Sequence, residues 1–147
     1  MTDTSDTGLS RLSGRQRLWI AALGLGLLVP LGVAGRLEPD PRDHGTHQQL
    51  GLPPCSYFAV FGRRCPTCGM TTAWAYLVRG RVPAAFRASV GGALAAVLAL
   101  AAVPWLLASA FRGRWLGWVP DSMRVAWVLA AVCAVTLIDW VVRIWTG

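Results

Sequence analysis

The sequence predicts an all-α integral membrane protein, with three transmembrane helices and a short interfacial helix in a cysteine-bearing connection. Of its 147 residues, 54% are hydrophobic and 14% are charged, and soluble domains carry roughly twice that share of charge. The apolar residues gather in three long runs, at about 18–35, 88–111 and 125–145. We therefore expect a single membrane domain over 18–147, preceded by a disordered basic segment over 1–17.

The first run, residues 18–35, carries no charge. At a rise of ~1.5 Å per residue it roughly spans the hydrocarbon core of a bilayer. Pro30 is expected to kink this helix near its end. A basic segment before an apolar run also describes a cleavable signal peptide. The run is long for such a peptide, which favours a retained helix.

The second run, residues 88–111, is rich in Ala and Leu and has no charged residue. Pro83 can open this helix in its first turn. Gly91, Gly92 and Ala95 would let another backbone approach closely. Between the first two runs, Thr71 or Thr72 can cap a short helix over 73–78, which we place at the membrane interface.

The third run, residues 125–145, contains Asp139 and Arg143, which are four residues apart and predict an interfacial ion pair. Cys133 lies mid-run and is expected to be a small buried hydrophobe.

The basic residues are all Arg, and they are spread through termini and loops. This distribution predicts contact with lipid headgroups and no nucleic-acid partner. Arginines before the first run and between the second and third favour a cytoplasmic N-terminus, with the cysteine-bearing connection outside. Three other arginines argue the other way: Arg79, Arg81 and Arg87.

The connection over residues 36–87 is too long to be structureless. It contains Cys65-Pro66-Thr67-Cys68-Gly69, in which a glycine with positive φ would let the backbone turn as in a zinc knuckle. Zinc prefers four nitrogen or sulfur ligands, and the chain places five candidates within 25 residues: His44, His47, Cys55, Cys65 and Cys68. We expect three Cys with one His, or two of each. The plainer alternatives are exposed loop histidines, and a structural disulfide or free thiols.

The same sulfur atoms allow a redox interpretation. A Cys-Pro-x-Cys pair at a helix N-terminus exchanges disulfides, with Cys65 and Cys68 as the catalytic pair. Cys55 would then shuttle the disulfide, and a membrane quinone could be the oxidant. Gly69 weakens this interpretation, since the helix would start after the pair. A c-type haem site is excluded because Gly69 stands where its motif needs His.

The segment from Cys65 to Ala73 resembles a bacterial membrane family catalogued as domain of unknown function 2752. That family has an upstream Cys, which Cys55 matches, then Cys-Pro-x-Cys-Gly-x-Thr-Arg-Ala, a Leu-rich turn with Arg-Gly, and an Ala/Phe-rich approach to a membrane helix. The resemblance covers about a third of the chain, roughly 55–105. Thr72 stands where the family usually has Arg. The resemblance implies a small multi-spanning protein of the bacterial inner membrane and brings no activity with it.

Three functions remain open from the sequence. The first is a non-enzymatic membrane protein whose connection folds around zinc and serves a membrane protein partner or a homo-oligomer. If water took the fourth ligand position, such a site could also catalyse. The second is a membrane thiol–disulfide oxidoreductase. The third is a helix-packing subunit of a larger complex.

Overall fold

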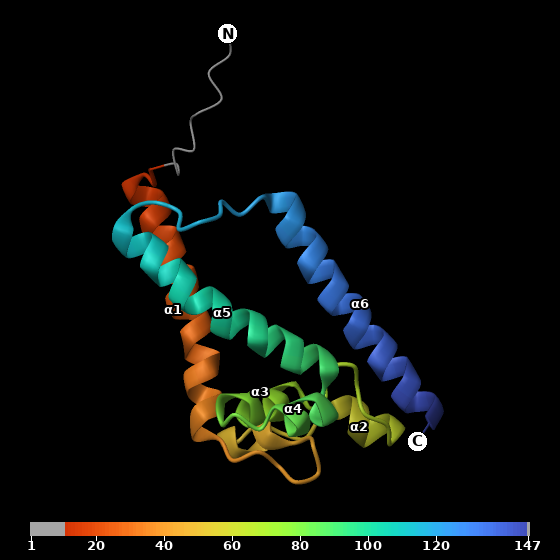
Figure 1. Ribbon diagram of the computed structural model, residues 1–147. Coiled ribbons are helices and arrows are strands. Elements are labelled where there is room, and N and C mark those ends of the chain that lie inside the picture. Colours follow the sequence, from red (N-terminus) through yellow and green to blue (C-terminus); the bar gives the residue numbers. More distant parts are fainter. Residues whose placement is uncertain (1–10, 147) are drawn as a thin grey trace.

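The computed structural model describes residues 11–146, and every regular element among them is helical (Figure 1). Three helices, α1 (Gly14–Arg36), α5 (Val90–Arg112) and α6 (Ser122–Thr146), are long and apolar enough to cross a membrane. Four short helices connect the first two: η1 (Thr46–Leu50), α2 (Ser56–Phe61), α3 (Met70–Val78) and α4 (Val82–Ala88). The predicted fold class is confirmed, with more short helices than the one expected.

Helix α1 begins earlier than the apolar run because Ser13 caps it. The Ser13 hydroxyl accepts from the Gln16 N–H, and the Gln16 side chain accepts from the Ser13 N–H. This reciprocal pair satisfies two backbone donors at the helix start. Residues 14–17, predicted to be disordered, are therefore helical, whereas residues 1–10 of that segment lie outside the described part of the chain. The helix continues through Pro30 to Arg36.

Helices α1 and α5 pack against each other, and they separate toward the end of the molecule that holds α3 and α4 (Figure 1). A Cβ added to Gly24 would lie 3.0 Å from Cδ2 of Leu107, so this glycine lets the two helices approach. Leu31 packs there with Ala99 and Val103 of α5.

A second core forms where α3 and α4 meet the first turns of α5. It is built largely from alanines that are fully buried, which allows the short helices to pack closely; they are Ala73, Ala85, Ala88, Ala93 and Ala96. The prediction that Pro83 opens the helix of the second apolar run is wrong, because Pro83 lies in the first turn of the separate short helix α4. The chain is extended at Ser89, whose hydroxyl accepts from the Gly92 N–H, so the second span starts as a separate helix at Val90.

Among the helices described, α6 packs against α5. An added Cβ at Gly91 would overlap Thr136 of α6, which confirms the close approach predicted for that glycine. The predicted ion pair is also present, with 3.0 Å between Arg143 Nε and Asp139 Oδ2. The prediction that Cys133 is buried is wrong. Its side chain is exposed, because the part of the chain that the structure describes does not cover this face of α6, which would face lipid in a membrane.

Three arginines donate to backbone carbonyls at the C-terminal end of another helix. The last carbonyls of a helix lack intrahelical partners, and positive charge is favourable there. Arg17 donates to the end of α5, Arg79 to the end of α1, and Arg143 to the end of α4. A bond from the Leu12 N–H to the Gly113 carbonyl also joins the start of α1 to the linker before α6. The connection over 36–87 lies at the opposite end of the molecule (Figure 1).

Candidate metal centre

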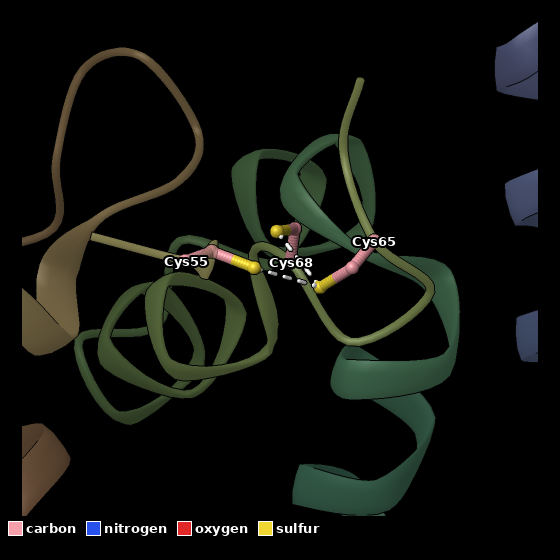
Figure 2. A group of neighbouring side chains, drawn as sticks. All are labelled: Cys55, Cys65 and Cys68. Carbon is pink, nitrogen blue, oxygen red and sulfur yellow. Dashed lines mark hydrogen bonds between the residues drawn. The ribbon is translucent and has the colours of Figure 1, made fainter. Parts of the chain in front are cut away.

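Three of the four cysteines converge at the end of the molecule formed by the short helices. Figure 2 shows their sulfur atoms directed toward one another. Cys65 Sγ lies 3.0 Å from Cys68 Sγ and 3.5 Å from Cys55 Sγ. All three sulfurs lie within 4.8 Å of one another, and none is in a disulfide. The three cysteines that the sequence predicted as ligands are therefore grouped so that they could hold a metal ion.

Local turns bring these sulfurs together. Cys55 is the N-cap of α2, and Gly62, with φ 64°, ends that short helix. The chain then returns to Cys65, and the Cys68 N–H donates to the Cys65 carbonyl at 3.0 Å. Gly69 has φ 89°, as the knuckle pattern predicted. These turns place Cys65 and Cys68 on one tight loop beside Cys55.

Gly69 is also required by its neighbours. A Cβ at this position would overlap the Ala88 carbonyl oxygen and lie 2.8 Å from the Asp43 carbonyl oxygen. Both contacts are with backbone, which cannot rotate away as a side chain can. The loop is therefore pressed against the end of α4 on one side and the segment before η1 on the other.

The predicted threonine cap of the short helix is wrong. Helix α3 begins at Met70, with Gly69 at its N-cap and no side-chain hydrogen bond there. Thr72 is instead fully buried, and its hydroxyl lies 2.8 Å from that of Thr46. Thr46 also accepts from the Asp40 N–H at 3.0 Å. This buried pair attaches the segment that carries the histidines to α3.

Both predicted histidine ligands line the same cavity as the three cysteines, which has a volume of about 620 Å³. They lie outside the close group of sulfurs. His44 Nδ1 is 2.7 Å from the Arg42 carbonyl oxygen, and the ring packs on Phe58 with centroids 5.5 Å apart. Because a carbonyl only accepts, Nδ1 is the donor in this bond, which leaves Nε2 as the ring nitrogen that could bind a metal.

The two cysteines of the loop differ in acidity. Burial opposes ionisation of Cys65, but its hydrogen bonds with Cys68 and Thr67 outweigh burial and lower the pKa of Cys65 to about 7. Burial and the hydrogen bond to Cys65 raise the pKa of Cys68 to about 12. One thiolate is therefore available near neutral pH in the ion-free protein, and it is that of Cys65.

The spacing of the sulfurs is compatible with two chemistries. Tetrahedral zinc with bonds of ~2.3 Å would place its sulfur ligands about 3.8 Å apart, which needs a small outward movement. A disulfide requires about 2.05 Å between Cys65 and Cys68, which needs a small inward movement. The 3.0 Å distance between the sulfurs of Cys65 and Cys68 thus lies between that of a disulfide and that of a zinc site.

A comparison with known families identifies this segment. Residues 55–103 match the family described as "Protein of unknown function (DUF2752)". The matched third of the chain holds Cys55, Cys65 and Cys68, and it is the region in which the sequence motif resembles that family. His44 and His47 precede it, and α6 follows it. No curated protein and no solved structure matches the chain.

One contact at the site involves a residue that the sequence analysis did not include. Trp140 of α6 donates from Nε1 to the Arg64 carbonyl at 2.8 Å, immediately before Cys65. The sequence did contain a signal for this contact, which is an indole N–H within an apolar run. A buried Trp usually donates to an acceptor, so such a residue predicts a hydrogen bond. The partner could not be named, because it comes from a distant part of the chain.

Proposed function

We propose that this chain is a protein of the bacterial inner membrane whose connection over 36–87 is folded around one zinc ion. Cys55, Cys65 and Cys68 supply three ligands, and His44 supplies the fourth. The observation that carries the proposal is the convergence of three sulfurs within 4.8 Å on one cavity. Isolated thiols have no packing reason to gather in this way.

The connection over 36–87 has little hydrophobic core, so a bound ion would stabilise it. Helix α2 has no buried residue, and Val60 and Phe61 are 74% and 63% exposed. A segment with so little core of its own gains order when an ion binds its side chains, since the free energy of binding then contributes to folding. The zinc centre would hold α2 against the start of α3.

His44 is favoured as the fourth ligand over His47. Zinc-bound histidines almost always donate their second ring N–H to a carbonyl or carboxylate, which orients the ring. His44 already makes this bond to the Arg42 carbonyl. Zinc would act here as a structural ion with a closed ligand shell, and catalysis is not required.

The role that follows is attachment to a partner. The ordered connection presents the exposed apolar residues of α2 to another membrane protein or to a second copy of the chain. The N-terminus and the linker before α6 would face the cytoplasm, and the zinc centre would face the opposite side. The simplest version of this role is that of a subunit whose helices pack within a larger complex.

Elemental analysis tests the proposal directly. The protein is purified in mild detergent without a histidine tag, beside a Cys65→Ser, Cys68→Ser double variant. We expect about one zinc per chain, lost in the double variant and reduced by His44→Ala. His47→Ala and Cys133→Ser are the matched controls and should retain zinc. Wild-type protein without zinc, in which Cys65 and Cys68 form a disulfide, would contradict the proposal.

A second candidate is a thiol–disulfide oxidoreductase, which the low pKa of Cys65 favours. Oxidation of Cys65 and Cys68 would form one S–S bond and release two protons and two electrons, which a membrane quinone would accept as quinol. Cys55 would attack the new disulfide and pass it on. Thiol alkylation that follows the redox poise of the buffer, and that is unchanged by His44→Ala, would support this candidate over zinc.

A further inference from the structure

Helix α6 is attached to the rest of the protein near the cysteines. Residues 121–130 are all exposed, and the first half-buried positions of α6 come after them. Three of the side chains that hold it are Thr136 against Gly91, Trp140 against the Arg64 carbonyl, and Arg143 against α4. Figure 1 shows α6 diverging from α5 toward its own N-terminal end.

Two of these side chains donate hydrogen bonds to backbone carbonyls beside the loop that carries Cys65 and Cys68. Trp140 Nε1 donates at 2.8 Å to the carbonyl that immediately precedes Cys65. Arg143 Nη1 donates at 3.1 Å to the Ala88 carbonyl, the same oxygen that a Cβ on Gly69 would overlap. Helix α6 therefore contacts the backbone before the loop directly, and it reaches the other flank through the Ala88 carbonyl that packs against Gly69, although it supplies none of the proposed ligands.

We propose that Trp140 and Arg143 are positioning residues for the cysteine loop, so that the placement of α6 in the bilayer sets the affinity of the site for zinc. The proposal rests on the proposed zinc centre for the identity of the ligand. Helix α6 can act in this way because the side chains of its proposed spanning segment are not buried in the protein. A tilt of α6 would pull on the Arg64 carbonyl and on the carbonyl that supports Gly69. The spacing of the sulfurs would change with it.

Zinc affinity of two tryptophan variants tests this inference. Trp140→Phe keeps an aromatic ring and removes the N–H that reaches Arg64. Trp127→Phe is the matched control, because Trp127 lies on the same helix and is 70% exposed. Loss of a partner that orients a metal site typically costs 10–100-fold in affinity. By chelator competition in detergent, we expect Trp140→Phe to weaken zinc binding about tenfold and Trp127→Phe to leave it unchanged. Equal affinities for the two variants would overturn the proposal.

A second measurement leaves the site unaltered. The eight tryptophans are replaced by 5-fluorotryptophan, and their fluorine resonances are assigned by Trp→Phe variants. If Trp140→Phe does not fold, Trp140 is the resonance left unassigned. Adding zinc should shift the Trp140 resonance and leave that of Trp127 in place. An unmoved Trp140 resonance would overturn the proposal, since a hydrogen bond that is coupled to the sulfurs must respond when they bind the ion.

The same spectra separate this inference from the proposed function. If the wild-type protein holds no zinc, the proposed function fails, and the Cys65–Cys68 pair is instead oxidised with diamide or reduced with a phosphine. A Trp140 resonance that differs between these two states supports the positioning role with a disulfide in place of the ion. Identical spectra overturn it.

Discussion

Gly69→Ala should destabilise the protein more than the same change at another glycine with positive φ. Gly69 has φ 89°, and an added Cβ would overlap the Ala88 carbonyl and crowd that of Asp43. Left-handed backbone costs an alanine roughly 1–2 kcal/mol, and forcing packed atoms apart costs a further ~1–3 kcal/mol. We expect a loss of about 3 kcal/mol, which lowers the melting temperature by about 6–12 °C in a chain of this size.

Gly62→Ala separates the two contributions. Gly62 has φ 64°, and an added Cβ there would meet nothing within 4 Å. This variant carries only the backbone strain, so its melting temperature should fall by about 2–8 °C. The assay is thermal unfolding in mild detergent, followed by intrinsic fluorescence, with bound zinc measured on the same samples. Equal losses in the two variants would refute the claim that Gly69 is held between two carbonyls.

Three further predictions concern other contacts. In reduced, ion-free protein, the pKa of about 7 for Cys65 means that its thiolate is populated above that pH. Its iodoacetamide alkylation, followed by mass spectrometry, should therefore be half-maximal near pH 7 and level off above about pH 8. Gly91→Ala should cost about 1–3 kcal/mol and loosen α6, because the new Cβ overlaps Thr136, as a lower melting temperature will show. Thr72→Val should cost about 1–3 kcal/mol in the same assay, because the buried Thr46 hydroxyl loses a partner.

Each of these predictions has a control within the chain. Cys68, with its pKa near 12, should stay unalkylated at the pH where Cys65 reacts. Gly26→Ala adds a Cβ to open space and should not lower the melting temperature. Thr71→Val changes the neighbouring hydroxyl, which is only half-buried. A melting temperature lowered as far by Thr71→Val as by Thr72→Val would contradict the role given to the buried threonine pair.

The three long apolar helices and the cysteine group could be predicted because each depends on residues that are close together in the sequence. The length and composition of an apolar run are enough to predict a helix that could cross a bilayer. The motif from Cys65 to Gly69 is likewise enough to predict the turn that it forms. Cys55 was predicted from its spacing and from the family resemblance. For the three long helices only the ends were displaced, and Ser13 and Ser89 cap two of them.

The contacts between distant segments could not be predicted in the same way. The need for glycine at position 69 depends on carbonyls from two other parts of the chain, and Thr72 is buried by a partner before η1. Cys133 was misjudged because an apolar run does not reveal which of its faces meets protein and which meets lipid. The histidines as ligands remain a prediction, since a shared cavity is compatible with the role without establishing it.

The arginine bonds at helix ends have a consequence for biosynthesis. Arg17 donates to a carbonyl 93 residues further along the chain, so it leaves the ribosome long before its acceptor exists. Arg143 is made after the carbonyls of α4 that it serves, and Trp140 after the cysteine loop. Insertion of α6 is thus the step that completes the hydrogen bonds around the loop. A nascent chain arrested before α6 would hold all three cysteines with the loop still unsupported, which is when mispairing with other thiols would be easiest.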